Sequence, residues 1–172
     1  MPSNDSLKSY FRGSRLLKNS VLLLGISLSA LTNGDASHLV KTQFRQTVEF
    51  ERVTLQVGEH LLDTEVAETP AQRSQGLMWR ESLPENSAML FIMDTQNKQC
   101  FWMRNTLIPL TVAFIDSNGR IIEFFDMQPL SDETHCATQP AQFGLEVNQG
   151  WFARKGITAG ERIRLIEDEQ SD

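Results

Sequence analysis

The residues best suited to chemistry form a short polar run directly after an apolar stretch. Arg104, Asn105 and Thr106 follow closely on Trp102. A guanidinium can hold a carboxylate or phosphate through two parallel hydrogen bonds, and an asparagine amide both donates and accepts. With Trp102 as an aromatic wall and Arg73 on a neighbouring helix, this run predicts a site for a small ligand. The competing interpretation is that Asn105 and Thr106 only hydrogen-bond backbone groups in a tight connection.

Glu146 is the one candidate for acid–base chemistry, because it stands in an otherwise apolar stretch, 144–147. If its side chain points inward, burial would raise the pKa of the carboxyl and suit it to proton transfer. An inward carboxylate would otherwise pair with a cation, and the arginines considered for this are Arg73, Arg80 and Arg104. Strand alternation gives the opposite interpretation, in which the two flanking residues are buried and Glu146 faces solvent.

Methionines, His135 and two cysteines raise the question of a copper site, since thioether sulfur suits Cu(I). The sequence has no Met-x-Met or His-x-x-x-His spacing, and methionines among Leu, Phe and Ile are typical core residues. We therefore expect no metal and no cofactor. A hydrolytic triad is not indicated either, because there is no Gly-x-Ser-x-Gly elbow and His38 and His60 stand in poor contexts.

The first 36 residues have the pattern of an export signal. A basic segment contains Lys8, Arg12, Arg15 and Lys18, and the apolar stretch 21–31 follows it. This stretch is about half of the ~20 residues that a membrane-spanning helix requires. We predict cleavage after Ala36 and a periplasmic or extracellular location, with no stable membrane span after cleavage. The alternative is an uncleaved membrane anchor.

The charge balance excludes two classes of partner. The whole chain has a net charge of −6, and residues 37–172 carry twelve Lys and Arg against twenty Asp and Glu. Such an acidic surface disfavours nucleic acids and anionic membranes, which are bound through Lys and Arg. We divide the rest of the chain into a flexible segment (37–46), one β-rich domain (47–167) and an acidic tail (168–172), since this length suits one hydrophobic core.

Cys100 and Cys136 both fall in the part predicted to be exported. In an oxidising compartment an even number of cysteines favours a disulfide. Closing a loop of this size would stabilise the fold by about 4 kcal/mol in the chain-entropy model. The alternative is a pair of separated thiols, one of them buried in a strand, because a bridge also requires suitably close Cβ atoms.

Alternating apolar residues predict the elements that would position these side chains. The predicted helices are one that starts at Thr69-Pro70 and runs toward Trp79, and a single turn at 151–153 capped by Asn148. The predicted strands form hairpins at 53–67 and 111–127, with further strands at 88–93, 100–103, 144–147 and 162–166 and a polar turn at 94–98. This pattern predicts a mainly β fold, either a jelly-roll-like sandwich or a partly closed barrel with two short helices.

Three blocks of sequence resemble the family called domain of unknown function 192. They are VAETPAQRSQGLMWRESLPENSAMLFIM, FWMRNTLIPLTVAFIDSNGRII and LEVNQGWFARKGITAGERI, and together they cover about residues 50–166. The resemblance implies a mainly β, jelly-roll-like domain that often follows an export signal. It does not imply any particular reaction. Cys100, Cys136 and His135 depart from the family pattern, so a bridge between the cysteines would be a local feature.

These observations favour an exported, non-catalytic binding module of the cell envelope, with its site near residues 102–106 and the helix at 69–79. The expected partner is a small molecule, a saccharide or an envelope protein. Two alternatives remain at this point. One is an envelope hydrolase that uses Glu146 as acid or base, and the other is a structural scaffold of an envelope assembly.

Overall fold

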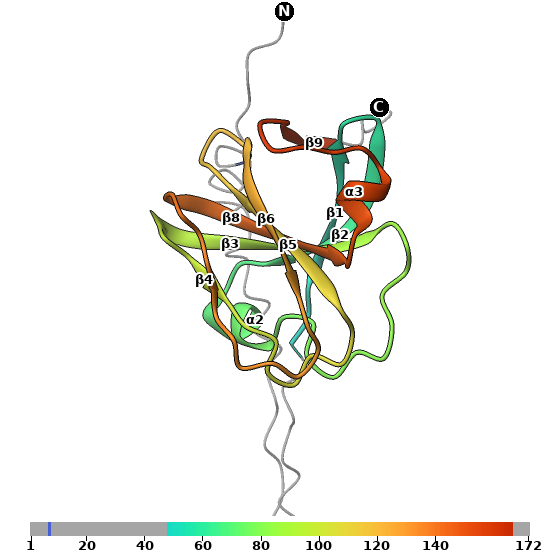
Figure 1. The fold of residues 1–172 in the computed structure, drawn as a ribbon, viewed down its shortest axis with the longest axis vertical. Coiled ribbons are helices and arrows are strands. Elements are labelled where there is room, and N and C mark those ends of the chain that lie inside the picture. The colour runs from blue at the N-terminus through green and yellow to red at the C-terminus, as the bar shows by residue number, and fades with distance from the viewer. Residues whose placement is uncertain (1–6, 8–47, 167–172) are drawn as a thin grey trace, which may run out of the picture.

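The computed structural model describes residue 7 and residues 48–166, which form one large sheet, one small sheet and two short helices (Figure 1). The large sheet has seven strands in the order β6-β5-β8-β3-β2-β1-β9, and the small sheet pairs β4 with β7. The elements are β1 (Glu51–Val57), β2 (His60–Ala67), α2 (Pro70–Gln75), β3 (Ser87–Asn97), β4 (Cys100–Phe101), β5 (Leu110–Ile115), β6 (Ile121–Met127), β7 (His135–Cys136), β8 (Ala141–Asn148), α3 (Trp151–Arg154) and β9 (Ile163–Ile166).

The two edges of the large sheet approach each other at one end only. The backbone N–H of Ile121, at the start of β6, donates to Glu161 O at 2.8 Å, and Ile163 N in β9 donates to Gly119 O at 2.9 Å. The remaining length of the two edge strands is not paired in this way in the described chain, so the sheet curls without closing. The prediction of a mainly β fold with two short helices is confirmed, and the seven-stranded sheet is not closed into a barrel.

Helix α2 lies on the crossover between the parallel strands β2 and β3. Its start is the predicted capping box: the Gln72 N–H donates to the Thr69 hydroxyl at 3.2 Å, and the Gln72 side-chain oxygen accepts from Thr69 N at 2.8 Å. The helix ends at Gly76, which has a φ of 47°, a conformation that favours glycine. It is therefore shorter than the prediction, which extended it toward Trp79.

Both faces of the central strands are buried. One face packs in a first cluster that includes Leu90, Leu145 and Trp151, and the other packs in a second cluster that includes Met89, Phe101 and Val112. The central strands are therefore nearly continuous apolar runs, because helix α2 and the small sheet cover the face that packs in the second cluster (Figure 1). A side chain in the middle of β8 is inside the protein whichever way it points.

Three local predictions are wrong. Residues 94–97 continue β3 and do not form the expected turn. This polar end of the strand stays beside β8, where Asn97 pairs with Ala141. Strand β7 was not expected, because two residues carry no alternation. Asn148 does not cap α3, where Gly150 is the N-cap residue; its amide instead donates to the carbonyls of Leu83 and Pro84, both at 3.0 Å.

The predicted disulfide is present. Cys100 in β4 and Cys136 in β7 face each other across the small sheet, with a Cα–Cα distance of 4.0 Å and an S–S bond. Phe101, the neighbour of Cys100, is buried in the second cluster. The disulfide therefore fastens the small sheet over that cluster.

The predicted signal peptide (1–36), flexible segment (37–46) and tail (168–172) lie outside the described residues, apart from Leu7. Leu7 is buried in the first cluster. Cleavage after Ala36 would remove this side chain from the core. In the described part of the chain, no helix has the length and hydropathy needed to cross a membrane.

Candidate functional site

A pocket of about 380 Å³ lies between α2 with its following loop, strand β3 and strand β4. Its volume is at the lower end of the range of small-molecule sites. We call it the Glu146 pocket, because this residue of β8 contributes the one carboxyl group to its lining. Apolar and polar groups share the wall about equally; the large apolar side chains are Leu77, Met78, Phe91, Met93, Phe101 and Trp102.

Glu146 is buried, with 4% of its surface exposed. Its strand runs between β3 and β5, and its direct neighbours across the sheet are Met89 and Val112. Burial among apolar groups raises the pKa of the carboxyl from 4.5 to about 8, because the charged form loses its hydration. Within the described chain no side chain or backbone group forms a hydrogen bond or ion pair with this carboxyl.

The inward placement of Glu146 follows from the two covered faces of the sheet. Leu145 and Val147 point into the first cluster, and Glu146 points to the opposite face, which the second cluster fills. The alternation argument correctly predicts that the two flanking residues are buried. It wrongly places Glu146 in solvent, because it assumes that the second face of the strand is open.

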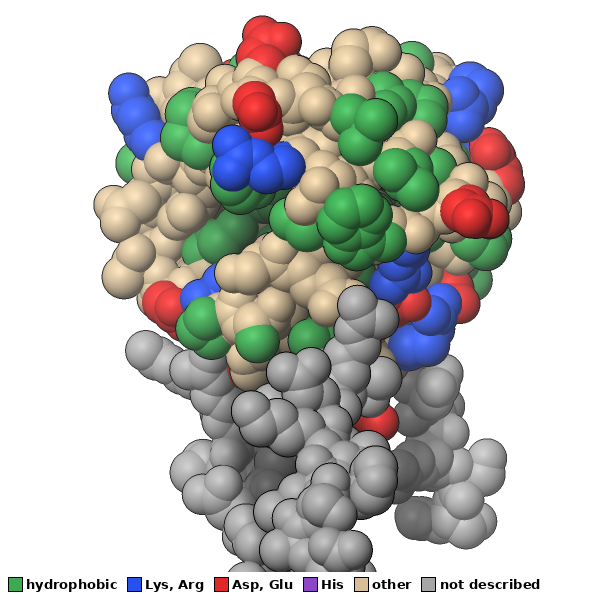
Figure 2. Space-filling model, turned by 90° about the horizontal axis from the view of Figure 1, so that it is seen from below, with side chains coloured by type: hydrophobic (Ala, Val, Ile, Leu, Met, Phe, Trp, Pro, Cys, Tyr) green, Lys and Arg blue, Asp and Glu red, His purple; other side chains and the backbone are tan. Residues whose placement is uncertain are grey.

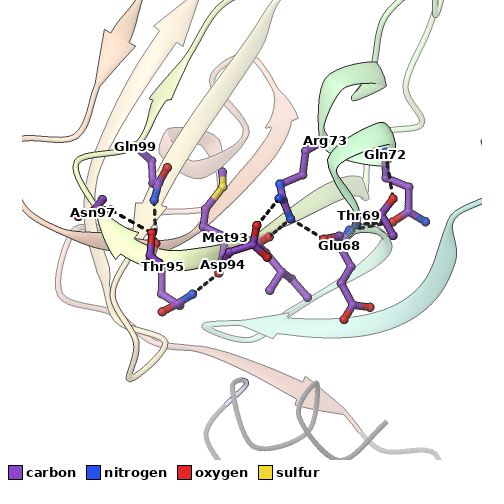
Figure 3. A network of polar contacts seen from close by, with 11 residues as sticks. Glu68, Thr69, Gln72, Arg73, Met93, Asp94, Thr95, Asn97 and Gln99 are labelled. Atoms are coloured by element: carbon purple, nitrogen blue, oxygen red, sulfur yellow. Dashed lines mark hydrogen bonds and ion pairs between the residues drawn. The ribbon is translucent and has the colours of Figure 1, made fainter. Parts of the chain in front are cut away.

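None of the three arginines considered as partners reaches Glu146. Arg73 points from α2 to the end of β3, where it donates to Ile92 O at 3.0 Å and to the Asp94 carboxylate at 2.7 Å, and it also donates to Glu68 O (Figure 3). Arg80 and Arg104 pair with other carboxylates; the pairs are Arg80–Glu65 and Arg104–Asp132. The ion pair considered for Glu146 does not form, because each of these guanidinium groups is paired with another carboxylate.

Only part of the predicted run 102–106 lines the pocket. Trp102 and Thr106 line the pocket, whereas Arg104 and Asn105 are not among its lining residues. The Arg104 guanidinium lies over the Trp102 ring, 4.2 Å from its centroid. Arg104 is therefore engaged with Trp102 and Asp132 and does not face the Glu146 pocket.

Asn105 and Thr106 hold neighbouring loops together through their backbone groups. Asn105 O accepts from Trp79 N at 2.9 Å, and Thr106 O accepts from Leu130 N at 3.0 Å. Asn105, Trp79 and Leu130 all have left-handed φ values, between 58° and 65°. The Thr106 side chain is buried at the pocket, and its hydroxyl has no hydrogen-bond partner among the described groups.

Exposed apolar side chains gather beside the pocket on this end of the molecule (Figure 2). Trp102 is 45% exposed and also lines the pocket, and Trp79 and Leu130 are 64% and 62% exposed. The left-handed backbone at Trp79 and Leu130 presents these side chains outward at a cost in conformational energy. The pocket therefore has exposed apolar side chains at its border.

Gly144 was not predicted to matter, although it shapes the pocket wall. A Cβ atom at this position would lie 2.4 Å from Cζ of Phe101, so only glycine leaves room for the ring. The Phe101 ring in turn packs edge-on against Phe91, with 5.0 Å between centroids. A glycine inside a strand, two residues before the buried carboxyl, is the sequence signal that could have revealed this close approach.

The described residues contain no cluster of three or more His, Cys, Asp or Glu side chains suited to a metal ion. The pocket lining contains one carboxyl, one guanidinium and the hydroxyls of Ser74 and Thr106, and it contains no histidine. Chemically, the arrangement offers a cavity of mixed polarity, with a buried carboxyl in its wall and hydroxyl and side-chain amide groups around it.

Comparison with known proteins identifies a family and similar solved structures. The family DUF192, described as "Uncharacterized ACR", matches residues 53–165. A crystal structure of a candidate transcription regulator from Sinorhizobium meliloti 1021 has 34% sequence identity and a TM-score of 0.63, covering 68% of this chain and 94% of that one. A protein of unknown function from Novosphingobium aromaticivorans DSM 12444 has 29% identity and a TM-score of 0.62, covering 81% and 99%. No curated protein matches the sequence.

Proposed function

This chain belongs to the DUF192 family of uncharacterised proteins, and from that premise we propose that it is an exported binding module of the cell envelope that holds one small ligand in the Glu146 pocket. The observation that carries the proposal is a buried carboxyl without a partner in the wall of a 380 Å³ cavity. Apolar pockets with a few polar groups are the usual form of a small-molecule site.

The energetic cost of Glu146 supports a ligand. A buried polar group that forms no hydrogen bond destabilises a folded protein by about 1–3 kcal/mol. Leucine or methionine at this position would fill the same face without that cost, as Met89 and Val112 do on either side. A ligand that hydrogen-bonds the carboxyl would recover the loss, and the cavity gives it room to do so.

Binding is a better interpretation of the lining than catalysis. Nucleophilic catalysis requires a nucleophile beside a base, and the residues lining the pocket include neither a histidine nor a second carboxyl next to Ser74 or Thr106. One observation favours the second candidate, an envelope hydrolase, because a carboxyl with a pKa of about 8 suits general acid catalysis near neutral pH. In that case Glu146→Gln would abolish turnover of envelope oligosaccharides and leave their binding intact.

The proposed compartment rests on the amino-terminal pattern and on the disulfide. A basic segment followed by the apolar stretch 21–31 is typical of a signal peptide. Disulfides such as the Cys100–Cys136 bridge form and persist mainly in oxidising compartments. The S. meliloti protein is described as a transcription regulator, and we do not propose this role for the present chain. The net charge of −6 disfavours binding to DNA phosphates.

A fragment screen by nuclear magnetic resonance tests the proposal. The ¹⁵N-labelled protein is titrated with small neutral fragments, and the expected hits shift the resonances of Phe101, Trp102 and Thr106. These shifts should vanish in Glu146→Leu and persist in Glu133→Gln, which changes an exposed carboxyl. A screen in which no fragment moves the pocket resonances, or in which Glu146→Leu binds every hit as well as the wild type, would refute the proposed function.

A further inference from the structure

We infer that the Glu146 pocket recognises a neutral amide group on an apolar body, with the Glu146 carboxyl donating a hydrogen bond to the amide oxygen. This inference rests on the proposed function and names the class of ligand. It starts from two buried groups that line the same pocket and have unused hydrogen-bonding capacity, the carboxyl of Glu146 and the hydroxyl of Thr106.

The donors and acceptors of these groups match an amide. A protonated carboxyl has one O–H donor and a carbonyl acceptor, and a threonine hydroxyl has one donor and two lone pairs. An amide carbonyl would accept from Glu146, and the amide N–H would donate to the carbonyl oxygen of Glu146 or to the hydroxyl of Thr106. The rest of the ligand would contact apolar groups such as Leu77, Met78 and Phe91.

Charged head groups fit the pocket less well. An ammonium ligand would require Glu146 to ionise among Met89, Val112 and the apolar wall, where the charged carboxylate is disfavoured. It would also approach the guanidinium of Arg73, the other ionisable side chain in the lining. A carboxylate ligand would lose its hydration beside a carboxyl group, with Arg73 already bound to Asp94 at 2.7 Å.

The groups that face Glu146 from each neighbouring element are uncharged apart from Arg73. Strand β3 contributes Met89, and β5 contributes Val112. The small sheet contributes Phe101 and the bridged Cys100, and Arg73 comes from α2. The lining as described contains no histidine and no free thiol, so pH dependence of binding near neutral pH reports on Glu146.

Three probes of nearly equal shape separate the head groups: 2-phenylacetamide, phenylacetate and phenethylammonium. We expect 2-phenylacetamide alone to shift the pocket resonances of the full-length protein at about 5 mM and pH 6. With a pKa of about 8, the protonated fraction of Glu146 falls about tenfold between pH 6 and pH 9. The affinity for 2-phenylacetamide should fall by the same factor.

Two substitutions keep the inference testable whatever their effect on stability. Glu146→Gln retains a donor and an acceptor, so it should bind 2-phenylacetamide within a fewfold of the wild type and lose the dependence on pH. Thr106→Val, which keeps the shape of the side chain, should weaken binding and keep the dependence on pH. Glu133→Gln, at an exposed position, serves as the control and should behave as the wild type.

The outcomes separate the inference from the proposed function. If phenethylammonium binds best and more tightly as the pH rises, the pocket recognises a cation, and the inference is wrong while the binding function stands. Preferential binding of phenylacetate has the same consequence. If no probe moves the pocket resonances of the wild type, the amide inference is refuted, and the broader fragment screen then decides the proposed function.

Discussion

Replacing Glu146 by glutamine should stabilise the ligand-free protein, increasingly so as the pH rises. The pKa of Glu146 is about 8 in the folded protein and near its ordinary value of 4.5 in the unfolded chain. Between these values the unfolded chain has released the proton that the folded protein retains. The contribution of Glu146 to the free energy of unfolding therefore falls with rising pH across this window.

The size of the effect follows from the two pKa values. Each pKa unit corresponds to about 1.4 kcal/mol, so the contribution of Glu146 to stability is intact below about pH 4.5 and falls by about 1.4 kcal/mol per pH unit above it. The loss is complete above about pH 8, where it amounts to about 5 kcal/mol. Glutamine does not titrate and should remove this dependence.

Urea denaturation at several pH values between about 5 and 8.5 measures the difference directly. We expect the stability curves of wild type and Glu146→Gln to diverge as the pH rises, and the control Glu133→Gln to follow the wild type. Parallel curves for wild type and Glu146→Gln would show that Glu146 ionises at its ordinary pKa in the folded protein. Burial of this carboxyl without a hydrogen-bonding partner would then be refuted.

Three further predictions concern the frame of the pocket and the amino terminus. Replacing both Cys100 and Cys136 by serine should lower the free energy of unfolding by about 4 kcal/mol, as measured by urea denaturation, and an unchanged midpoint would contradict this. Gly144→Ala should destabilise by about 1–3 kcal/mol through its clash with Phe101, and Phe101→Leu in the same chain should recover part of the loss; additive effects would refute the contact. Mass spectrometry of the exported protein should find Ser37 at the amino terminus, and a chain that retains residue 1 would refute cleavage after Ala36.

Local patterns were sufficient to predict much of the fold. The hairpins β1–β2 and β5–β6 follow from alternating apolar residues around short turns, and the start of α2 follows from Thr69, Pro70 and Gln72. These features depend on residues close together in the sequence. The residues at 94–97 were misassigned because a polar segment can extend a strand wherever a partner strand continues beside it, and the sequence does not show the partner.

The site was only partly predictable for a similar reason. The residue types pointed to Glu146, Arg73, Trp102 and Thr106, and all four line the pocket. Which arginine would pair with which carboxylate depends on contacts between distant segments, such as Arg104 with Asp132. The burial of Glu146 depends on what covers the second face of β8, and that cover is built from α2 and the small sheet.

A carbon-13 titration of the Glu146 carboxyl tests the central claim most directly. Burial disfavours the charged form, so we expect a midpoint near pH 8 for the free protein. Saturation with 2-phenylacetamide should raise this midpoint, since the amide binds the protonated carboxyl. A midpoint near the ordinary pKa of 4.5, or a midpoint that 2-phenylacetamide lowers, would contradict the account.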